Sequence, residues 1–181
     1  DMPDILGLSN YPWNHHLNIS IAKYAKSKNK NVIIVFGGPY ISYDSNQQEL
    51  FMARYKGLVD FYCMFEGETS FKSLLDNAHQ ASFDISKMKK APIEGCLFLS
   101  NDGRLASFTP ITRSRSIDDY PSPYNMGLMD EFFDGKLSPM IETHRGCPYS
   151  CTFCHEGHDF YRKVSRFDLQ RIKDELEYIA K

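Results

Sequence analysis

Short apolar runs alternate with helix-spaced apolar positions along the first eighty residues of the chain. Residues 4–9, 32–36 and 58–65 form the runs, and the unbroken, mainly β-branched run at 32–36 is typical of a strand covered on both faces. Apolar positions with helical spacing follow each run, at residues 17–25, 46–55 and 71–78. This order predicts a parallel α/β sheet with right-handed crossovers.

The pattern changes after residue 80. Apolar stretches at 95–99 and 105–108 flank the turn sequence Asn101-Asp102-Gly103, which predicts a β-hairpin. Residues 110–125 are rich in proline, serine and charged side chains, a composition typical of an inter-domain linker. Residues 126–133 predict a short helix.

A second folded segment is predicted toward the C-terminal end. Residues 139–143 predict a strand, and Ser165 with Asp168 predicts the capped start of a helix. The helix is amphipathic, with its apolar positions at Leu169, Ile172, Leu176 and Ile179.

The composition adds little chemistry but excludes several classes of partner. The chain has 181 residues, of which 42% are hydrophobic, and its 21 basic and 23 acidic side chains give a net charge of -2. This balance gives no support to binding of nucleic acid or of an anionic membrane surface. Unbroken apolar stretches such as residues 32–36 are too short to cross a bilayer. We therefore expect no nucleic-acid partner and no membrane association.

Three predicted loops share one edge of the sheet, because every strand-to-helix loop of a parallel sheet emerges on the same side. They comprise residues 9–16, 37–40 and 66–70, whose small, polar or glycine residues would let the backbone approach a large ligand. Ordinary turn chemistry accounts for the same residues equally well. Adjacent histidines rarely point at one target, so we expect His15 and His16 to lie in a solvated helix-entry turn.

The five cysteines are Cys63, Cys96, Cys147, Cys151 and Cys154. An odd number, with three crowded into eight residues, indicates metal or redox chemistry in a reducing compartment rather than a disulfide framework. Cys63 and Cys96 lie within predicted strands, where we expect them to be small buried side chains.

The spacing C-x3-C-x2-C of the last three cysteines predicts a metal centre. Three thiolates on so short a loop can ligate three corners of a [4Fe-4S] cluster, with Gly146 and Pro148 helping the backbone to bend. Three cysteines leave one iron open, as a catalytic cluster requires. A zinc site with His155 or His158 as the fourth ligand is the alternative.

This motif resembles that of the radical S-adenosylmethionine (radical SAM) superfamily: Cys147, Cys151 and Cys154, with Arg145-Gly146 before them and Phe153 before the last cysteine. The resemblance implies that the cysteines ligate the cluster and that S-adenosylmethionine chelates the fourth iron. Reductive cleavage would then yield a 5′-deoxyadenosyl radical that abstracts hydrogen from the substrate. It further implies that Phe153 lies near the adenine, and that a donor such as flavodoxin or ferredoxin supplies the electron.

Two further parts of the sequence resemble the same superfamily. Residues 139–143 and 167–180 match the first strand and helix of its partial (βα)6 barrel. Residues 3–9, 35–39 and 59–68 resemble the cobalamin-binding domain fused ahead of many members. By this resemblance the candidate cobalamin contacts are Ser9, Gly37, Gly38, Glu66 and Gly67.

The resemblance therefore implies two incomplete domains. We expect a partial Rossmann-like, cobalamin-binding-like α/β domain with a parallel sheet and a hairpin over residues 1–108. A linker over 109–136 and the start of a radical SAM barrel over 137–181 would follow.

We expect the chain to be an internal part of a longer cytoplasmic enzyme, a cobalamin-dependent radical SAM methyltransferase that acts on an unactivated carbon of a small molecule. A radical SAM oxidoreductase or cyclase with a vestigial cobalamin domain is one alternative. A non-catalytic module that binds a metal or cofactor is another. We expect the chain by itself to be catalytically inert.

Overall fold

The computed structural model describes residues 3–106 and 116–181. The chain forms two compact units, residues 1–112 and 113–181, whose boundary falls within the segment expected to be a linker. Residues 107–115, which include the end of the expected hairpin and the start of the expected linker, lie outside the described residues.

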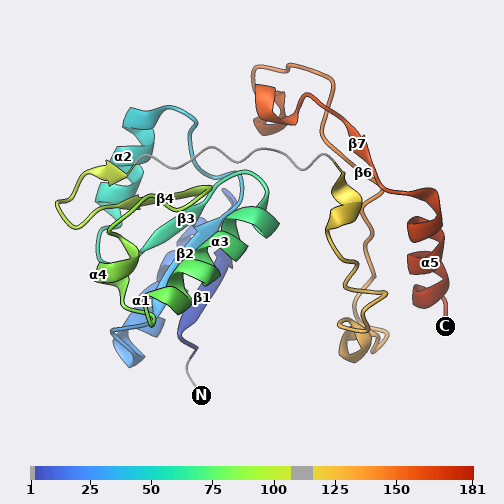
Figure 1. Cartoon of the computed structure of the whole chain (residues 1–181), viewed down its shortest axis with the longest axis horizontal. Helices are drawn as coiled ribbons and strands as arrows, with labels where there is room; N and C mark the ends of the chain where they lie inside the picture. The colour runs from blue at the N-terminus through green and yellow to red at the C-terminus, as the bar shows by residue number, and fades with distance from the viewer. Residues whose placement is uncertain (1–2, 107–115) are drawn as a thin grey trace. The chain divides into compact units, whose positions relative to one another are not determined.

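The first unit is built on one five-stranded sheet with the order β1-β2-β3-β4-β5 (Figure 1). Strands β1 (Ile5–Ser9), β2 (Ile33–Gly37) and β3 (Phe61–Cys63) are parallel. Strands β4 (Cys96–Leu99) and β5 (Leu105–Ala106) continue the sheet with antiparallel pairing. The α/β fold expected from the sequence, with its parallel strands and hairpin, is confirmed.

The three expected helices follow the parallel strands in order: α1 (His15–Lys28), α2 (Ser45–Arg54) and α3 (Gly67–Gln80). A short helix that the sequence did not predict, α4 (Ile85–Met88), comes directly after α3. The start of α2 is fixed by Asp44, whose side chain accepts a hydrogen bond from the Gln47 N–H at 3.0 Å.

The core of the unit has two layers, one on each face of β2. On one face, Ile34 and Phe36 cluster with Ala22 and Ala25 of α1 and with Met52 of α2. The alternate residues of β2 join the opposite cluster, which contains Ile33, Val35, Leu74, Ala78 and Met88. Strand β2 is therefore covered on both faces, as its unbroken apolar run predicts.

Helix α1 buries only part of the face that its helix-spaced apolar positions form. Ala25 is buried, but Leu17 and Tyr24 are 61% and 63% exposed. The other buried side chains of α1 are His15, Asn18 and Ala22. Hydrogen bonds hold the two polar residues inward: His15 Nδ1 lies 3.0 Å from Asn10 Oδ1, and Asn18 Nδ2 donates to the Ser9 carbonyl at 2.8 Å.

The second unit contains a two-stranded sheet and one long helix. Strand β6 (His144–Arg145) pairs antiparallel with β7 (Ser165–Arg166), and α5 (Leu169–Ile179) follows directly. The described part of the unit also contains four short 3-10 helices: η1 (Ile117–Asp119), η2 (Asp130–Phe132), η3 (His155–Gly157) and η4 (Asp159–Tyr161). No helix in the described part of the chain is long and apolar enough to cross a membrane.

Two local predictions in the second unit were wrong, and a third is confirmed only in part. Residues 139–143 form no strand, because a strand needs a hydrogen-bonded neighbour and the pairing begins only at β6. Residues 126–133 form turns that end in η2 rather than a continuous helix. Ser165 belongs to β7, so Asp168 alone caps α5, accepting a hydrogen bond from the Gln170 N–H at 2.8 Å.

Helix α5 is present as predicted, but only part of its apolar stripe is covered. Leu169 and Leu176 are 64% and 50% exposed, whereas Ile172 and Ile179 are half-buried and Glu175 is buried. An ion pair with Arg171 at 3.3 Å compensates the charge of Glu175.

Candidate cluster loop and sheet-edge site

The three motif cysteines lie on the loop that joins β6 to β7. Cys147 is half-buried, Cys151 and Cys154 are exposed, and all three are free thiols. The Cys154 N–H donates a hydrogen bond to the Cys151 carbonyl at 3.1 Å, so the second half of the motif is a tight turn. The structure therefore places all three cysteines on one short loop, with none of them in a disulfide.

A close backbone approach at Gly146 fixes the start of the loop. Gly146 has a φ of +106°, and a Cβ there would lie 2.8 Å from the Tyr161 carbonyl oxygen and overlap the Lys163 carbonyl. The Cys147 N–H donates to the same Tyr161 carbonyl at 2.8 Å. Only glycine suits both this φ and this contact, so Gly146 lets the returning chain pass directly beside the first cysteine.

A second glycine folds the loop back over the motif. A Cβ at Gly157 would overlap the carbonyl oxygen of Cys151, and the Gly157 N–H donates to the Cys154 carbonyl at 3.0 Å. The Arg162 guanidinium donates to Ser150 Oγ at 2.8 and 3.2 Å. The sequence signals Gly146 but not Gly157, whose close partner lies six residues upstream and is brought near only by the folded loop.

The donor chemistry of this loop fits an iron–sulfur cluster. Among the described residues, no three His, Cys, Asp or Glu side chains are arranged to hold a single metal ion. A cubane cluster does not need its ligands to converge on one ion, because each thiolate binds a separate iron.

The two histidines considered as zinc ligands make other contacts. Nε2 of His155 lies 3.2 Å from the Tyr161 hydroxyl, and Nδ1 of His158 accepts a hydrogen bond from the Phe160 N–H at 3.2 Å. Partial burial lowers the pKa of His155 below its ordinary value.

The aromatic residue predicted to contact S-adenosylmethionine stands clear of the rest of the chain. Phe153 is 91% exposed, next to the third cysteine. Its ring is therefore accessible to a flat ligand such as an adenine, which would cover apolar surface that the chain itself leaves open.

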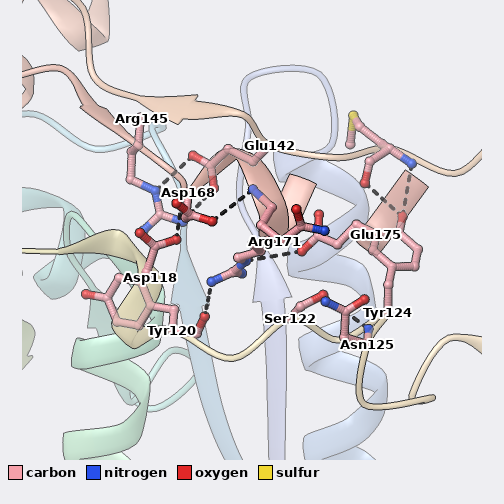
Figure 2. A network of polar contacts seen from close by, with 12 residues as sticks. Asp118, Tyr120, Ser122, Tyr124, Asn125, Glu142, Arg145, Asp168, Arg171 and Glu175 are labelled. Atoms are coloured by element: carbon pink, nitrogen blue, oxygen red, sulfur yellow. Dashed lines mark hydrogen bonds and ion pairs between the residues drawn. The ribbon is translucent and has the colours of Figure 1, made fainter. Parts of the chain in front are cut away.

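A strap of residues 116–125 braces the elements on either side of the cysteine loop (Figure 2). The Asp118 carboxylate accepts a hydrogen bond from the Asp168 N–H at 3.0 Å, at the start of α5. Arg145, in β6, lies over the Tyr120 ring at 5.4 Å and forms a two-point ion pair with Glu142 at 2.7 and 2.9 Å. The strap therefore contacts both the strand that enters the loop and the helix that follows it.

The same strap also holds the inner side of α5. Arg171 donates to the Tyr120 carbonyl, pairs with Glu175 at 3.3 Å and lies 4.1 Å from the centre of the Phe167 ring. Tyr124 is buried, and its hydroxyl donates to the Met140 carbonyl at 2.8 Å. The polar side chains shown in Figure 2 thus join three segments of this unit.

The five candidate cobalamin contacts lie at the C-terminal edge of the parallel strands in the first unit. Ser9 ends β1 and is the register partner of Gly37, which ends β2 and precedes Gly38. Glu66 is the N-cap residue of α3, and Gly67 is its first residue. Glu66 is buried, Gly37 is half-buried, and the other three are exposed.

Asn10, which sequence reasoning missed, organises this edge. It is fully buried; its N–H donates to the Gly37 carbonyl and its own carbonyl accepts from the Tyr40 N–H at 3.2 Å. Tyr62 joins the same network by donating to the Gly38 carbonyl at 2.8 Å, and burial raises the pKa of Tyr62 well above its ordinary range. A Cβ at Gly38, where φ is +102°, would lie 2.9 Å from the Asn10 carbonyl oxygen.

His15 is part of this network rather than of a solvated turn, so that expectation was wrong. Its Nδ1 lies 3.0 Å from Asn10 Oδ1, and its Nε2 lies 2.8 Å from the Tyr55 hydroxyl. Because an amide oxygen only accepts, Nδ1 carries the proton and Nε2 accepts from Tyr55. Burial, and then the charges of His16 and Arg54, lower the pKa of His15, which favours this neutral form.

A cavity of about 800 Å³ opens beside this network, between the loop after β2 and helix α2. Its lining includes His15, Tyr40, Phe51, Arg54 and Tyr55. None of the five candidate cobalamin contacts lines this cavity. The edge residues named from the sequence and this cavity are therefore neighbouring but separate features.

No protein-family model matches the chain. The chain is nevertheless a homologue, along nearly its whole length, of known methyltransferases, and one of these is a cobalamin-dependent radical SAM enzyme.

Three relatives illustrate the match. The chain is 30% identical to the 2-(S-pantetheinyl)-carbapenam-3-carboxylate methyltransferase of Streptantibioticus cattleyicolor, over 98% of the chain and 26% of the relative. It is 31% identical to the cobalamin-dependent radical SAM methyltransferase TokK of Streptomyces tokunonensis, over 99% and 26%. An uncharacterized methyltransferase of Pyrococcus horikoshii is 30% identical, over 98% and 37%. The chain thus spans about a quarter to a third of the length of the curated relatives it matches.

Proposed function

We propose that the chain is the part of a cobalamin-dependent radical SAM methyltransferase that carries the cluster loop and a cobalamin-binding sheet edge. The observation that carries this proposal is the C-x3-C-x2-C motif, held as three free thiols on a loop braced by Gly146 and Gly157. Its support from relatives is that the alignment runs through both units and that the relatives named above are methyltransferases.

Cys147, Cys151 and Cys154 would hold a [4Fe-4S] cluster, and the exposed ring of Phe153 would pack near the adenine of S-adenosylmethionine. When bound, these groups supply the reductive cleavage that opens an unactivated C–H position, and cobalamin supplies the methyl group. Gly146 would keep the returning chain close to Cys147, so that the loop holds its shape while the thiolates bind.

Cobalamin would lie against the C-terminal edge of the parallel strands. Ser9, Gly37, Gly38, Glu66 and Gly67 are the proposed contacts. The exposed glycines suit this role because a backbone without Cβ atoms lets a large flat ligand approach closely. Asn10 and Tyr62 would keep the first two edge loops in one conformation through the hydrogen bonds described above.

The proposed substrate is a small molecule with an unactivated carbon as the methyl acceptor. A flavodoxin or ferredoxin is proposed as the electron donor, and the cytoplasm, a reducing compartment, as the location, since it keeps motif thiols available for iron. The proposed organisation is a cobalamin-binding domain over residues 1–108, a linker over 109–136 and the start of the barrel over 137–181.

Retention of cobalamin by the chain tests the part of this proposal that separates it from other radical SAM chemistry. Chain mixed with methylcobalamin under anaerobic conditions and passed through a desalting column should retain corrinoid absorbance. Gly67→Val should lower that retention at least tenfold, because a Cβ at Gly67 meets no protein atom within 4 Å and the added side chain would project into the proposed cofactor space.

Lys72→Ala is the matched control, because Lys72 is an exposed residue of the same helix, paired only with Asp76 at 2.6 Å among the ion pairs of the described residues. It should retain corrinoid as the unsubstituted chain does. A folded chain that retains no corrinoid would contradict the cobalamin assignment and favour a radical SAM reaction without methyl transfer from cobalt.

A further inference from the structure

Two cysteines outside the cluster motif lie side by side in the first unit. Cys63 ends β3 and Cys96 begins β4, and the two are direct register partners in the antiparallel pairing of these strands. Their Sγ atoms are 3.9 Å apart. Both residues are buried, with exposed fractions of 7% for Cys63 and 0% for Cys96. The sequence predicts the burial of each cysteine but not their pairing, since register is a property of the folded sheet.

The backbone already meets the geometric requirement for a disulfide. Directly opposed residues of antiparallel strands have Cα atoms about 4.5–5.5 Å apart, within the range of about 4.4–6.8 Å that disulfides span. Closing the sulfur separation from 3.9 Å to a bond therefore requires side-chain rotation rather than movement of a strand.

The surroundings of the two thiols shift their pKa values in opposite directions, so one thiol can react before the other. The hydrogen bond with Cys96 lowers the pKa of Cys63, whereas the same contact and burial raise the pKa of Cys96. Cys96 has one S–H proton, and the Ser70 carbonyl oxygen, 3.4 Å from its Sγ, is the alternative acceptor to Cys63. Cys63 is the thiol that more readily becomes a thiolate, the reactive form of cysteine.

We propose that Cys63 and Cys96 are a redox-active pair that closes to a cross-strand disulfide when the chain meets a peroxide. The Cys63 thiolate attacks one peroxide oxygen and breaks the O–O bond, which gives a Cys63 sulfenic acid and hydroxide. The Cys96 sulfur then attacks the Cys63 sulfur, the S–O bond breaks, and the sulfenic oxygen leaves as water with the Cys96 proton. The hydroxide takes up the proton that Cys63 had lost. Two thiols are oxidised by two electrons, and one hydrogen peroxide is reduced to two waters.

A disulfide between Cys63 and Cys96 would constrain the backbone close to the C-terminal edge of the parallel strands. Cys63 is also the register partner of Gly37 on β2, and Glu66 and Gly67 follow it closely in the chain. A disulfide would join β3 to β4 immediately before the loop that enters α3. The proposal does not depend on the proposed function, since it concerns only the thiols of the first unit.

Peptide mapping of the whole chain tests the proposal, because trypsin places Cys63, Cys96 and the motif cysteines in three different peptides. Cleavage after lysine and arginine places Cys63 in peptide 57–72, Cys96 in peptide 91–104 and the three motif cysteines in peptide 146–162. The exposed motif thiols are first blocked with N-ethylmaleimide on the native chain, which is then treated with hydrogen peroxide. Remaining thiols are labelled with isotopically heavy N-ethylmaleimide after unfolding.

We expect a cross-linked species of peptides 57–72 and 91–104. Heavy labelling of both cysteines should fall at least tenfold and return after treatment with a phosphine reductant. The Cys96→Ser variant should give no cross-linked species, and its Cys63 should instead be trapped as a sulfenic acid by dimedone. Unchanged heavy labelling of both cysteines in the native chain, or separate oxidation of each without a cross-link, would overturn the proposal. The mapping of the unsubstituted chain decides the matter even where the variant fails to fold.

Discussion

The carboxylate of Asp118 accepts a hydrogen bond from the backbone N–H of Asp168, with 3.0 Å between Oδ1 and the nitrogen. This contact joins residues 50 positions apart and places the strap at the first turn of α5. Asp168 in turn caps the helix by accepting from the Gln170 N–H at 2.8 Å. The segment before the cysteine loop and the helix after it are therefore parts of one folded unit.

Removal of this acceptor should destabilise the second unit. Asp118→Ala leaves the Asp168 N–H without its partner, and we expect the free energy of unfolding to fall by about 1 kcal/mol. Asp118→Asn keeps a carbonyl oxygen that can accept, so its effect should be smaller. Urea unfolding followed by circular dichroism measures both, with Glu177→Ala, an exposed position of α5, as the control. Equal stability of the Asp118→Ala variant and the unsubstituted chain would contradict the bracing role of the strap.

Gly146 should be far less tolerant of alanine than another glycine with a similar backbone. Both Gly146 and Gly135 have positive φ, +106° and +76°, but a Cβ at Gly135 meets no protein atom within 4 Å. Both substitutions place a Cβ at a positive φ, which strains the backbone. In Gly146→Ala the Cβ also collides with two carbonyl groups. We therefore expect Gly146→Ala to lower the free energy of unfolding by about 1–3 kcal/mol more than Gly135→Ala does. Comparable losses in the two variants, measured by urea unfolding, would show that the close approach beside Cys147 is not constraining.

The buried His15 predicts a pH dependence of stability. The unfolded chain protonates this imidazole near its ordinary pKa of about 6.5, whereas the folded chain does so only at lower pH. The unfolded state therefore binds more protons below about pH 6.5, and stability falls as the pH decreases below that value. Well above that pH, His15 is neutral in both states and does not change the free energy of unfolding with pH.

Replacing His15 with a side chain that does not titrate should reduce that slope. Glutamine can still donate to Asn10 and accept from Tyr55, so His15→Gln should lose less stability than the unsubstituted chain between pH 7.5 and pH 5.5. His79→Asn, which removes an exposed imidazole from α3, is the matched control and should keep the original slope. Identical slopes for His15→Gln and the unsubstituted chain would refute the burial of a neutral His15.

The sequence predicts most directly those elements whose apolar pattern matches their own burial, such as strand β2 with its unbroken apolar run. Helix α5 is also predicted, from its helical spacing, although Leu169 and Leu176 of its apolar stripe are exposed. Predictions failed where burial is decided by distant partners. His15 was expected in a solvated turn, but it is buried because Asn10 and Tyr55 hydrogen-bond to it.

The candidate sites also combine features that the sequence shows directly with features that arise only in the folded chain. The spacing of Cys147, Cys151 and Cys154 is written in the sequence, so the motif was found directly. The fit of Gly157 against Cys151 and the register of Cys63 with Cys96 arise only when the loop and the sheet are folded. No periodic pattern of side chains encodes such contacts between backbone segments.

Anaerobic reconstitution of the chain with iron and sulfide tests the central claim most directly. The unsubstituted chain should bind about four irons and show a thiolate-to-iron absorbance at about 400 nm. Cys151→Ala should lose both, whereas Cys63→Ala, a cysteine outside the motif, should keep them. Loss of iron and absorbance in Cys151→Ala alone would support the motif as the cluster site, and their full survival in that variant would contradict it.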